Sequence, residues 1–183
     1  QPLQIHGNTF CTTFSINERD GLWATAGHCA QAAYFYETMT GENVTIDGHL
    51  ATLMYVDQWT DVAVFHADFY VPAFEMADTS PAVCRQDAPR ECERLTIVGF
   101  PYGLTRSVTQ GTLSAHNIPL YHDTYRQLVL SDMLDITVAG GNSGSPILNE
   151  QGKVVGILWG GFEGSPISVS VPLDSVRRAL FGF

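Results

Sequence analysis

The stretch GGNSGSP, residues 140–146, contains three glycines on the two sides of Ser143 and ends on a proline. Glycine adopts backbone conformations that other residues avoid, so the chain can turn sharply on both sides of Ser143. Such turns can point the backbone N–H groups of Gly141 and Ser143 at one position in space. The stretch therefore predicts a reactive serine with an oxyanion hole formed by Gly141 and Ser143.

Two further segments offer the partners that a reactive serine needs. A serine hydroxyl is a weak nucleophile until an imidazole takes its proton, and a buried carboxylate must orient that imidazole. The segment ATAGHC, residues 24–29, contains His28, and the segment TDVAVF, residues 60–65, contains Asp61. We predict a catalytic triad with Ser143 as nucleophile, His28 as general base and Asp61 as the orienting residue.

The order of these residues along the chain separates three classes of hydrolase. Residues 141–145, GNSGS, match the G-x-S-x-G pattern of α/β-hydrolases except at the last position, which is Ser145, and in those enzymes the histidine follows the serine. In this chain every histidine precedes Ser143, namely His6, His28, His49, His66, His116 and His122. The subtilisin order begins with Asp, and Asp20 precedes His28, but the β-rich pattern argues against that fold. The order His, Asp, Ser remains.

Short apolar or alternating runs, separated by turn residues, recur along the chain and predict an all-β protein. The expected strands lie at residues 9–16, 21–26, 33–36, 43–46, 49–56, 62–66, 95–98, 106–114, 127–131, 145–148, 154–159 and 167–171. Near the C-terminus the apolar residues take helical spacing, which predicts a helix at about 174–181, capped by Asp174 or Ser175.

A segment rich in proline, cysteine and charge, residues 79–94, divides the chain near its middle. At 183 residues the chain has the size of one domain. We therefore expect a single domain, residues 1–183, built from an N-terminal barrel at about 1–88 and a C-terminal barrel at about 89–183.

The composition excludes several function classes. Hydrophobic residues make up 45% of the chain and charged residues only 15%, against about 25% charged in an average soluble protein, so a core can form. The net charge of -10 would repel nucleic-acid phosphates and anionic membranes. No apolar stretch approaches the ~20 residues that span a bilayer. We expect no nucleic-acid or membrane partner, no cofactor, no metal and a monomeric state.

The four cysteines form two pairs that are close in sequence, Cys11 with Cys29 and Cys84 with Cys92. Neither pair has the C-x-x-C spacing of a zinc or redox site, so we predict two disulfides and an oxidising, extracellular location. Four buried free thiols are the alternative. The start Gln1-Pro2-Leu3 lacks an initiator Met, as expected after removal of a signal or pro-segment.

The three segments around His28, Asp61 and Ser143 resemble those of the trypsin-like peptidase superfamily. Residues 140–161, which include the run WGG at 159–161, are similar to the bacterial glutamyl endopeptidases of staphylococcal type. The resemblance implies two six-stranded antiparallel β-barrels of chymotrypsin-like fold and a secreted serine endopeptidase that cleaves proteins or peptides through an acyl-enzyme.

The same resemblance bears on the cysteines. Cys11 and Cys29 correspond to the disulfide that braces the histidine loop in many chymotrypsin-like enzymes, whereas the pair Cys84 and Cys92 has no counterpart.

The substrate pocket departs from the glutamyl enzymes at two positions. Those enzymes carry a histidine directly before the Trp-Gly-Gly run and a threonine five residues before the nucleophile, where this chain has Leu158 and Val138. A substrate carboxylate buried without these polar partners would be destabilised. We expect a preference for an apolar or small residue before the cleaved bond. The predicted pocket residues are Thr137, Val138, Leu158, Trp159, Gly160 and Gly161.

Several residues have a simpler interpretation. Asp57 lies close to Asp61 and could compete for its role. His116 and His122 flank an expected loop and could bind a metal, but we expect both to be ordinary histidines exposed to solvent.

Trypsin-like zymogens have an aspartate just before the nucleophile, where Asn142 stands here, so we expect no ion-pair activation switch. The aromatic residues Tyr34, Phe35, Tyr36, Phe65, Phe69 and Tyr70 are expected in the core.

Two other functions remain open at this point. One is a viral polyprotein-processing serine protease, against which two real disulfides would argue because cytosolic thiols stay reduced. The other is a catalytically silent protease-like protein that binds partners through the same scaffold.

Overall fold

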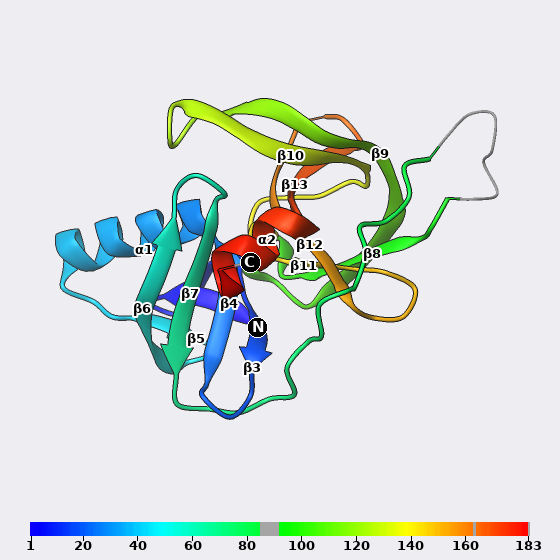
Figure 1. Ribbon diagram of the computed structural model, residues 1–183. Helices are drawn as coiled ribbons and strands as arrows, with labels where there is room; N and C mark the ends of the chain where they lie inside the picture. Colours follow the sequence, from blue (N-terminus) through cyan, green and yellow to red (C-terminus); the bar gives the residue numbers. More distant parts are fainter. Residues whose placement is uncertain (85–91, 163, 183) are drawn as a thin grey trace.

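The computed structural model describes residues 1–84, 92–162 and 164–182, and consists of two β-sheet units with a helix at the C-terminal end (Figure 1). The predicted all-β class, with two β units and a C-terminal helix, is confirmed. Among the described residues, no helix combines the length and apolar character needed to cross a membrane. Part of the predicted dividing segment, residues 85–91, lies outside the described residues.

The N-terminal unit is a seven-stranded antiparallel sheet with the order β2-β1-β5-β6-β7-β4-β3. Its strands are β1 (Pro2–Ile5), β2 (Asn8–Thr12), β3 (Phe14–Asn17), β4 (Leu22–Ala26), β5 (Val44–Ile46), β6 (His49–Asp57) and β7 (Val62–Ala67). The two edge strands β2 and β3 are joined by Thr13 alone, so the sheet must curl back on itself as a half-barrel. It has one strand more than the six predicted.

The C-terminal unit is a closed six-stranded barrel with the order β10-β13-β12-β11-β8-β9. Its strands are β8 (Leu95–Gly99), β9 (Ser107–His122), β10 (Gln127–Asp135), β11 (Pro146–Leu148), β12 (Val154–Gly161) and β13 (Ile167–Pro172), with a short 3₁₀ helix η2 (Pro101–Gly103) after β8. Strands β9 and β10 form a long hairpin that extends beyond the barrel toward the N-terminal unit (Figure 1).

The prediction of a strand at residues 33–36 is wrong, because these residues belong to helix α1 (Gly27–Thr40). The buried residues of this helix are small and recur at helical spacing: Gly27, Cys29, Ala30 and Ala33. The aromatic run that suggested a strand lies on the exposed side, so the prediction that Tyr34, Phe35 and Tyr36 are core residues is also wrong. Phe65 is buried as predicted and Phe69 is partly buried against the same core, whereas Tyr70 is exposed, so its prediction is wrong as well.

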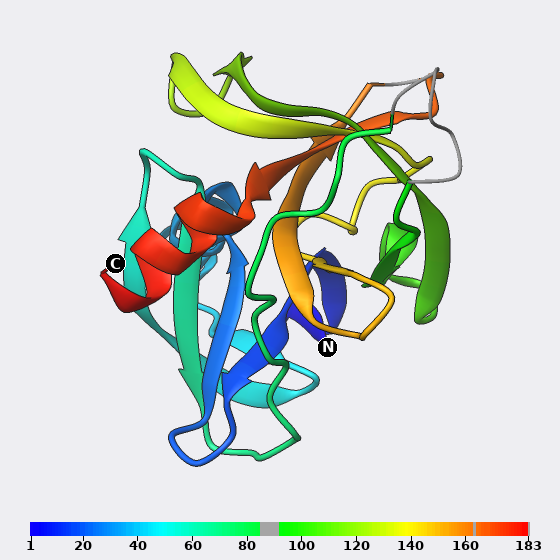
Figure 2. The ribbon, with the colours of Figure 1, turned by 45° about the vertical axis from the view of Figure 1, so that its right-hand side comes forward.

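Helix α2 (Leu173–Phe181) begins one residue before the predicted start and has Pro172 at its N-cap, so neither Asp174 nor Ser175 is the cap. It crosses between the two units (Figure 2). Val176 is buried in the same hydrophobic cluster as the N-terminal sheet, and Arg177 donates hydrogen bonds to the carbonyls of Ala77 and Asp78. The C-terminal end of the chain therefore packs on both units.

Candidate active site

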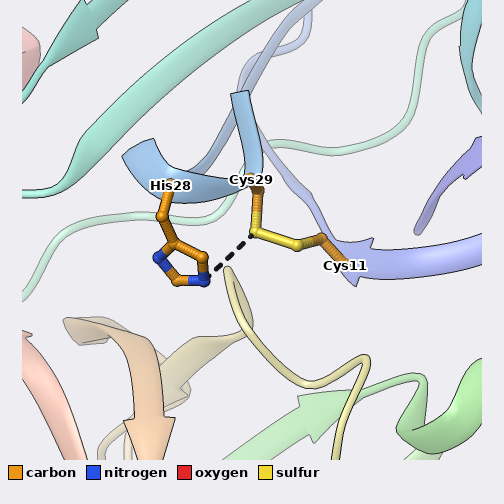
Figure 3. Close-up of side chains that lie close together, drawn as sticks. All are labelled: Cys11, His28 and Cys29. Carbon is orange, nitrogen blue, oxygen red and sulfur yellow. Dashed lines mark hydrogen bonds between the residues drawn. A yellow bond between two sulfur atoms is a disulfide. The ribbon is translucent and has the colours of Figure 1, made fainter. Parts of the chain in front are cut away.

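The first part of the site is the junction of β4 and α1, where a disulfide ties the chain to β2. Cys11 and Cys29 are joined with their Cα atoms 6.2 Å apart, and Cys84 is joined to Cys92, which confirms both predicted pairs. In Figure 3 the imidazole of His28 lies beside this first disulfide, with its Nε2 atom 3.8 Å from the sulfur of Cys29. The disulfide therefore limits how the helix start that carries His28 can move.

Asp61 faces His28 from the turn before β7. Its carboxylate accepts the backbone N–H of His28 on Oδ1 at 2.7 Å and contacts the Nδ1 atom of His28 through Oδ2 at 2.9 Å. The backbone carbonyl of Asp61 also accepts the N–H of Gly27 at 2.9 Å. Asp61 has a positive φ of 57°, a conformation that Asp tolerates better than most residues. These contacts hold the carboxylate against the imidazole.

Asp57 has a different place in the structure. Its carboxylate accepts the backbone N–H of Trp59 at 2.9 Å and the hydroxyl of Thr60 at 2.7 Å. Such an Asx-type turn is a common local use of aspartate. Asp57 therefore shapes the turn that presents Asp61, and does not contact His28.

The carboxyl group of Asp61 is fully buried. Burial raises its pKa, but the interactions with His122 and His28 outweigh burial and lower the pKa from 3.8 to about 2. Asp61 is therefore ionised at neutral pH. An ionised carboxylate next to Nδ1 holds that nitrogen in its protonated form and leaves Nε2 of His28 able to accept a proton.

The second part of the site is the loop from Ala139 to Ser145, which makes two successive turns. Asn142 donates its backbone N–H to Ala139 at 3.2 Å, and Ser145 donates to Asn142 at 3.0 Å. The third residue of each turn is a glycine with positive φ, Gly141 at 91° and Gly144 at 86°, as type II turns require. The glycines on both sides of the serine are thus explained by turn geometry.

This loop is held against the N-terminal unit by Thr12 of β2. The Thr12 hydroxyl donates to the carbonyl of Gly141 at 2.9 Å, and the Thr12 backbone N–H donates to the carbonyl of Ser143 at 2.8 Å. A Cβ atom at Gly144 would lie 2.0 Å from Thr25 Oγ1, so only glycine fits this close approach. Within the described chain, the N–H groups of Gly141 and Ser143 have no acceptor.

The hydroxyl of Ser143 donates to the carbonyl of Trp159 at 3.3 Å. No hydrogen bond joins it to His28 in the described structure. The structure therefore brings together His28 and Asp61 and places the loop of Ser143 beside them. It does not show a hydrogen bond between the Ser143 hydroxyl and the His28 imidazole. Such bonds are often long in the absence of substrate and shorten when it binds.

A cavity of about 680 Å³ opens beside Ser143. Five of the six predicted pocket residues line it, namely Thr137, Val138, Leu158, Gly160 and Gly161. The predicted pocket residue Trp159 does not, because its indole packs against the ring of His122, with the ring centroids 4.7 Å apart, and donates to the hydroxyl of Ser131 at 3.1 Å. None of the described lining residues is charged.

The remaining lining residues were missed by the sequence analysis: Tyr102, Ala139, Gly140, Phe162, Gly164, Ser165 and Pro166. Most of them adjoin predicted pocket residues in sequence, so a wider window around residues 137–138 and 160–161 would have found them. Tyr102 comes from η2, and nothing in its sequence context connects it with the pocket.

The expectation of two solvated histidines is wrong for His122. Its side chain is 3% exposed, and its Nε2 atom lies 3.4 Å from Oδ2 of Asp61. His116 is partly exposed and pairs with the buried Asp132 at 2.7 Å. The site thus contains a second histidine that the sequence analysis did not assign.

His28, Asp61 and His122 place ligand atoms within 4.8 Å of one another, a spacing that could hold a divalent cation. A second group, Cys11, His28 and Cys29, has the same compactness. Its two sulfurs are joined in a disulfide and cannot act as thiolate ligands.

Solved structures share this architecture. The crystal structure of an inactive mutant of Rv3671c from M. tuberculosis H37Rv gives a TM-score of 0.74 at 19% identity, covering 98% of this chain and 83% of that chain. The serine endoprotease from Yersinia pestis gives a TM-score of 0.64 at 21% identity, covering 92% of this chain and 55% of that chain. At these identities the likeness shows the fold.

Sequence relatives are bacterial proteins described as "Probable periplasmic serine endoprotease DegP-like". The one from Halomonas elongata is 33% identical over 171 residues, which are 88% of this chain and 32% of the relative. The one from Hahella chejuensis is 28% identical over 184 residues, covering 95% of this chain and 34% of the relative. The chain spans about a third of the length of these curated relatives.

The trypsin-like peptidase domain family matches residues 11–157. The matched range includes His28, Asp61 and Ser143 and extends over both β units. The chain therefore belongs to the trypsin-like peptidase family.

Proposed function

We propose that this chain is a serine endopeptidase that hydrolyses peptide bonds through an acyl-enzyme on Ser143. The observation that supports it most directly is the pair of His28 and the buried, ionised Asp61, next to a loop whose two turns present Ser143. In this mechanism His28 takes the proton of the Ser143 hydroxyl as the oxygen attacks the substrate carbonyl carbon. His28 then returns the proton to the leaving amine, and water releases the acyl group by the same steps.

The oxyanion of each tetrahedral intermediate would be bound by the N–H groups of Gly141 and Ser143. Their carbonyls are turned toward Thr12, and the N–H groups are free of acceptors in the described chain. Two donors fixed before substrate arrives stabilise the developing charge without reorganisation, an effect of roughly 3 kcal/mol per donor.

Catalysis requires the Ser143 hydroxyl to leave the carbonyl of Trp159 and turn toward His28. The bond it gives up is 3.3 Å long, at the weak end of the range for a hydroxyl donor. The Ser143 hydroxyl therefore gives up only a weak hydrogen bond when it turns toward His28.

The substrate preference we propose is an apolar or small residue before the cleaved bond. Val138 and Leu158 stand in the cavity wall, and a substrate carboxylate would be desolvated there without a cationic or hydroxyl partner at these positions. The resemblance to the glutamyl endopeptidases of staphylococcal type is, by this reasoning, one of scaffold and active-site loop rather than of specificity.

For its setting, we propose a secreted, monomeric peptidase domain formed by residues 1–183, with protein or peptide substrates and no nucleic-acid, membrane, cofactor or metal requirement. The two disulfides fit an oxidising compartment. Asn142 is buried and uncharged at the place where an ion-pair switch would need a carboxylate. We expect the folded chain to be active without such a switch.

Labelling with a serine-directed phosphonofluoridate tests the proposal. We expect stoichiometric labelling at Ser143, found by intact mass and peptide mapping, and none in the Ser143→Ala variant. Mapping of cleaved peptides then tests the pocket, and predominant cleavage after Glu, Lys or Arg would refute the apolar preference. Folded protein that does not label would favour the catalytically silent, binding form of the scaffold.

A further inference from the structure

His122, the last residue of β9, is buried next to the proposed triad and plays no part in it so far. Its side chain is 3% exposed, and neither ring nitrogen has a hydrogen-bond partner of good geometry in the described structure. A buried polar group without a hydrogen-bond partner destabilises the folded state. The nearest charged atom to its Nε2 is Oδ2 of Asp61, at 3.4 Å, so the structure needs only a small adjustment to pair them.

The ring of His122 is held in this place by aromatic neighbours. Its ring centroid lies 4.6 Å from that of Tyr125 and 4.7 Å from that of Trp159, each inclined by 33°, and 5.5 Å from that of His28. Trp159 is itself fixed by its hydrogen bond to Ser131. The imidazole therefore has little freedom to turn its nitrogens away from the carboxylate.

The β9–β10 hairpin, which carries His122, is hydrogen-bonded to the N-terminal unit. Its tip reaches over the turn between β6 and β7 (Figure 1), and the side chain of Gln127 donates to the carbonyl of Gln58 in that turn at 2.7 Å. Asp61 follows in the same turn. The C-terminal unit thus contributes a side chain to the half of the site that the N-terminal unit builds.

We propose that His122 is a positioning residue, which donates a hydrogen bond from Nε2–H to Oδ2 of Asp61 and holds the carboxylate in the orientation that His28 needs. A neutral imidazole carries one N–H and one acceptor nitrogen, and the nitrogen that faces a carboxylate is the one that keeps the proton. This inference rests on the proposed function, because it concerns the efficiency of the same triad.

Tyr125 belongs to the same arrangement. Burial, with the nearby charge of Asp61, raises the pKa of its phenol, so the group stays neutral. The space around it is tight, since a Cβ atom at Gly27 would lie 2.5 Å from the Tyr125 hydroxyl. The same Cβ atom would lie 3.1 Å from Oδ1 of Asp61, so the phenol and the carboxylate are neighbours on one side of Gly27.

The test compares three variants. His122→Phe keeps an aromatic ring in the stack and removes the donor. His122→Gln offers an amide N–H in its place. His116→Ala is the matched control, because His116 is also on β9 but pairs with a different aspartate, Asp132 of β10, at 2.7 Å. Circular dichroism and thermal melts select variants that fold.

In a peptide hydrolysis assay we expect His122→Phe to lower kcat by roughly tenfold to hundredfold at nearly unchanged KM. This is less than the ~10⁴-fold loss seen when the aspartate of such a triad is neutralised. We expect His122→Gln to recover a large part of kcat and His116→Ala to match the unmodified chain. Equal kcat in the Phe variant and the unmodified chain, or no recovery in the Gln variant, would overturn the proposal.

A spectroscopic measurement separates this inference from the proposed function, because it needs no turnover. We expect the NMR signal of the His28 Nδ1 proton to move in His122→Phe, to return toward its original position in His122→Gln, and to stay in place in His116→Ala. A signal that is the same in all four proteins would refute the role of His122, even if Ser143 labels normally. A signal that responds as expected in a chain that does not label would support it while the proposed function fails.

Discussion

Two histidine–aspartate pairs in this molecule are alike in local geometry and differ in their surroundings. His28 contacts Asp61 at 2.9 Å, and His116 contacts Asp132 at 2.7 Å. In each pair the carboxylate also accepts a backbone N–H, from His28 at 2.7 Å and from Asn117 at 3.0 Å. Both carboxylates are buried. The pair geometry alone therefore does not distinguish a candidate catalytic site from a structural one.

The electrostatic state of the two carboxylates does differ. The pKa of Asp61 is lowered to about 2, since its interactions with His122 and His28 outweigh burial. The pKa of Asp132 is raised, because burial exceeds the effects of the Asn117 N–H and of His116. Asp132 lies at a bulge between β9 and β10, where it satisfies an irregular stretch of backbone. Only the first pair lies beside a loop that presents a serine.

The largest effect should come from neutralising one carboxylate at a time. We expect Asp61→Asn to lower kcat/KM by roughly 10³–10⁴-fold, because the imidazole of His28 loses the charge that orients it. Asp132→Asn should leave the rate within about threefold, since it is outside the site. A peptide hydrolysis assay checks both variants. Comparable losses in the two would show that the second pair also takes part in the reaction.

The Cys11–Cys29 disulfide braces only the first of the two pairs. Cys11 and Cys29 are separated by 18 residues, and a disulfide that closes such a loop stabilises a fold by roughly 3 kcal/mol. We expect the double variant Cys11→Ser, Cys29→Ser to lose about that free energy of unfolding in urea. The NMR signals of the two histidines should show which pair is disturbed by the loss of the disulfide. We expect His28 to be perturbed and His116 to be unchanged, and the reverse result would contradict a bracing role.

The smallest effect should be the pH dependence of stability, in which the two aspartates have opposite signs. The folded pKa of Asp61, about 2, lies below its ordinary value of 3.8, so its contribution is present above about pH 4 and is lost as the pH falls toward 2. The contribution amounts to roughly 2 kcal/mol. The folded pKa of Asp132 is raised, so the cost of its ionisation appears as the pH rises.

Urea unfolding of variants across the acid range measures these contributions. We expect Asp61→Asn to lose less stability on acidification than the unmodified chain does. We expect Asp132→Asn to lose more, because the gain from protonating Asp132 is absent. If the free energy of unfolding changed with pH at the same rate in all three proteins, neither carboxylate would have a shifted pKa in the folded state.

Much of the site could be predicted from the sequence because its chemistry is local. The serine loop needs glycines at the third position of two turns, and the structure places Gly141 and Gly144 there with positive φ. The all-β class and the C-terminal helix followed from apolar periodicity, whereas the six-stranded barrels were implied by the resemblance to the trypsin-like peptidases. Where periodicity was short and the residues were aromatic, as at residues 33–36, it could not distinguish a strand from an exposed helical face.

Residue types at short spacing were sufficient to identify the family, the order of the three candidate triad residues and the cysteine pairs. The three-dimensional structure was needed to show which side chains meet across distant segments. It decided that Asp57 shapes a turn, that Trp159 faces away from the cavity, and that His122 reaches Asp61 from the other unit. These outcomes depend on how the β9–β10 hairpin packs on the N-terminal sheet, which no local pattern of residues specifies.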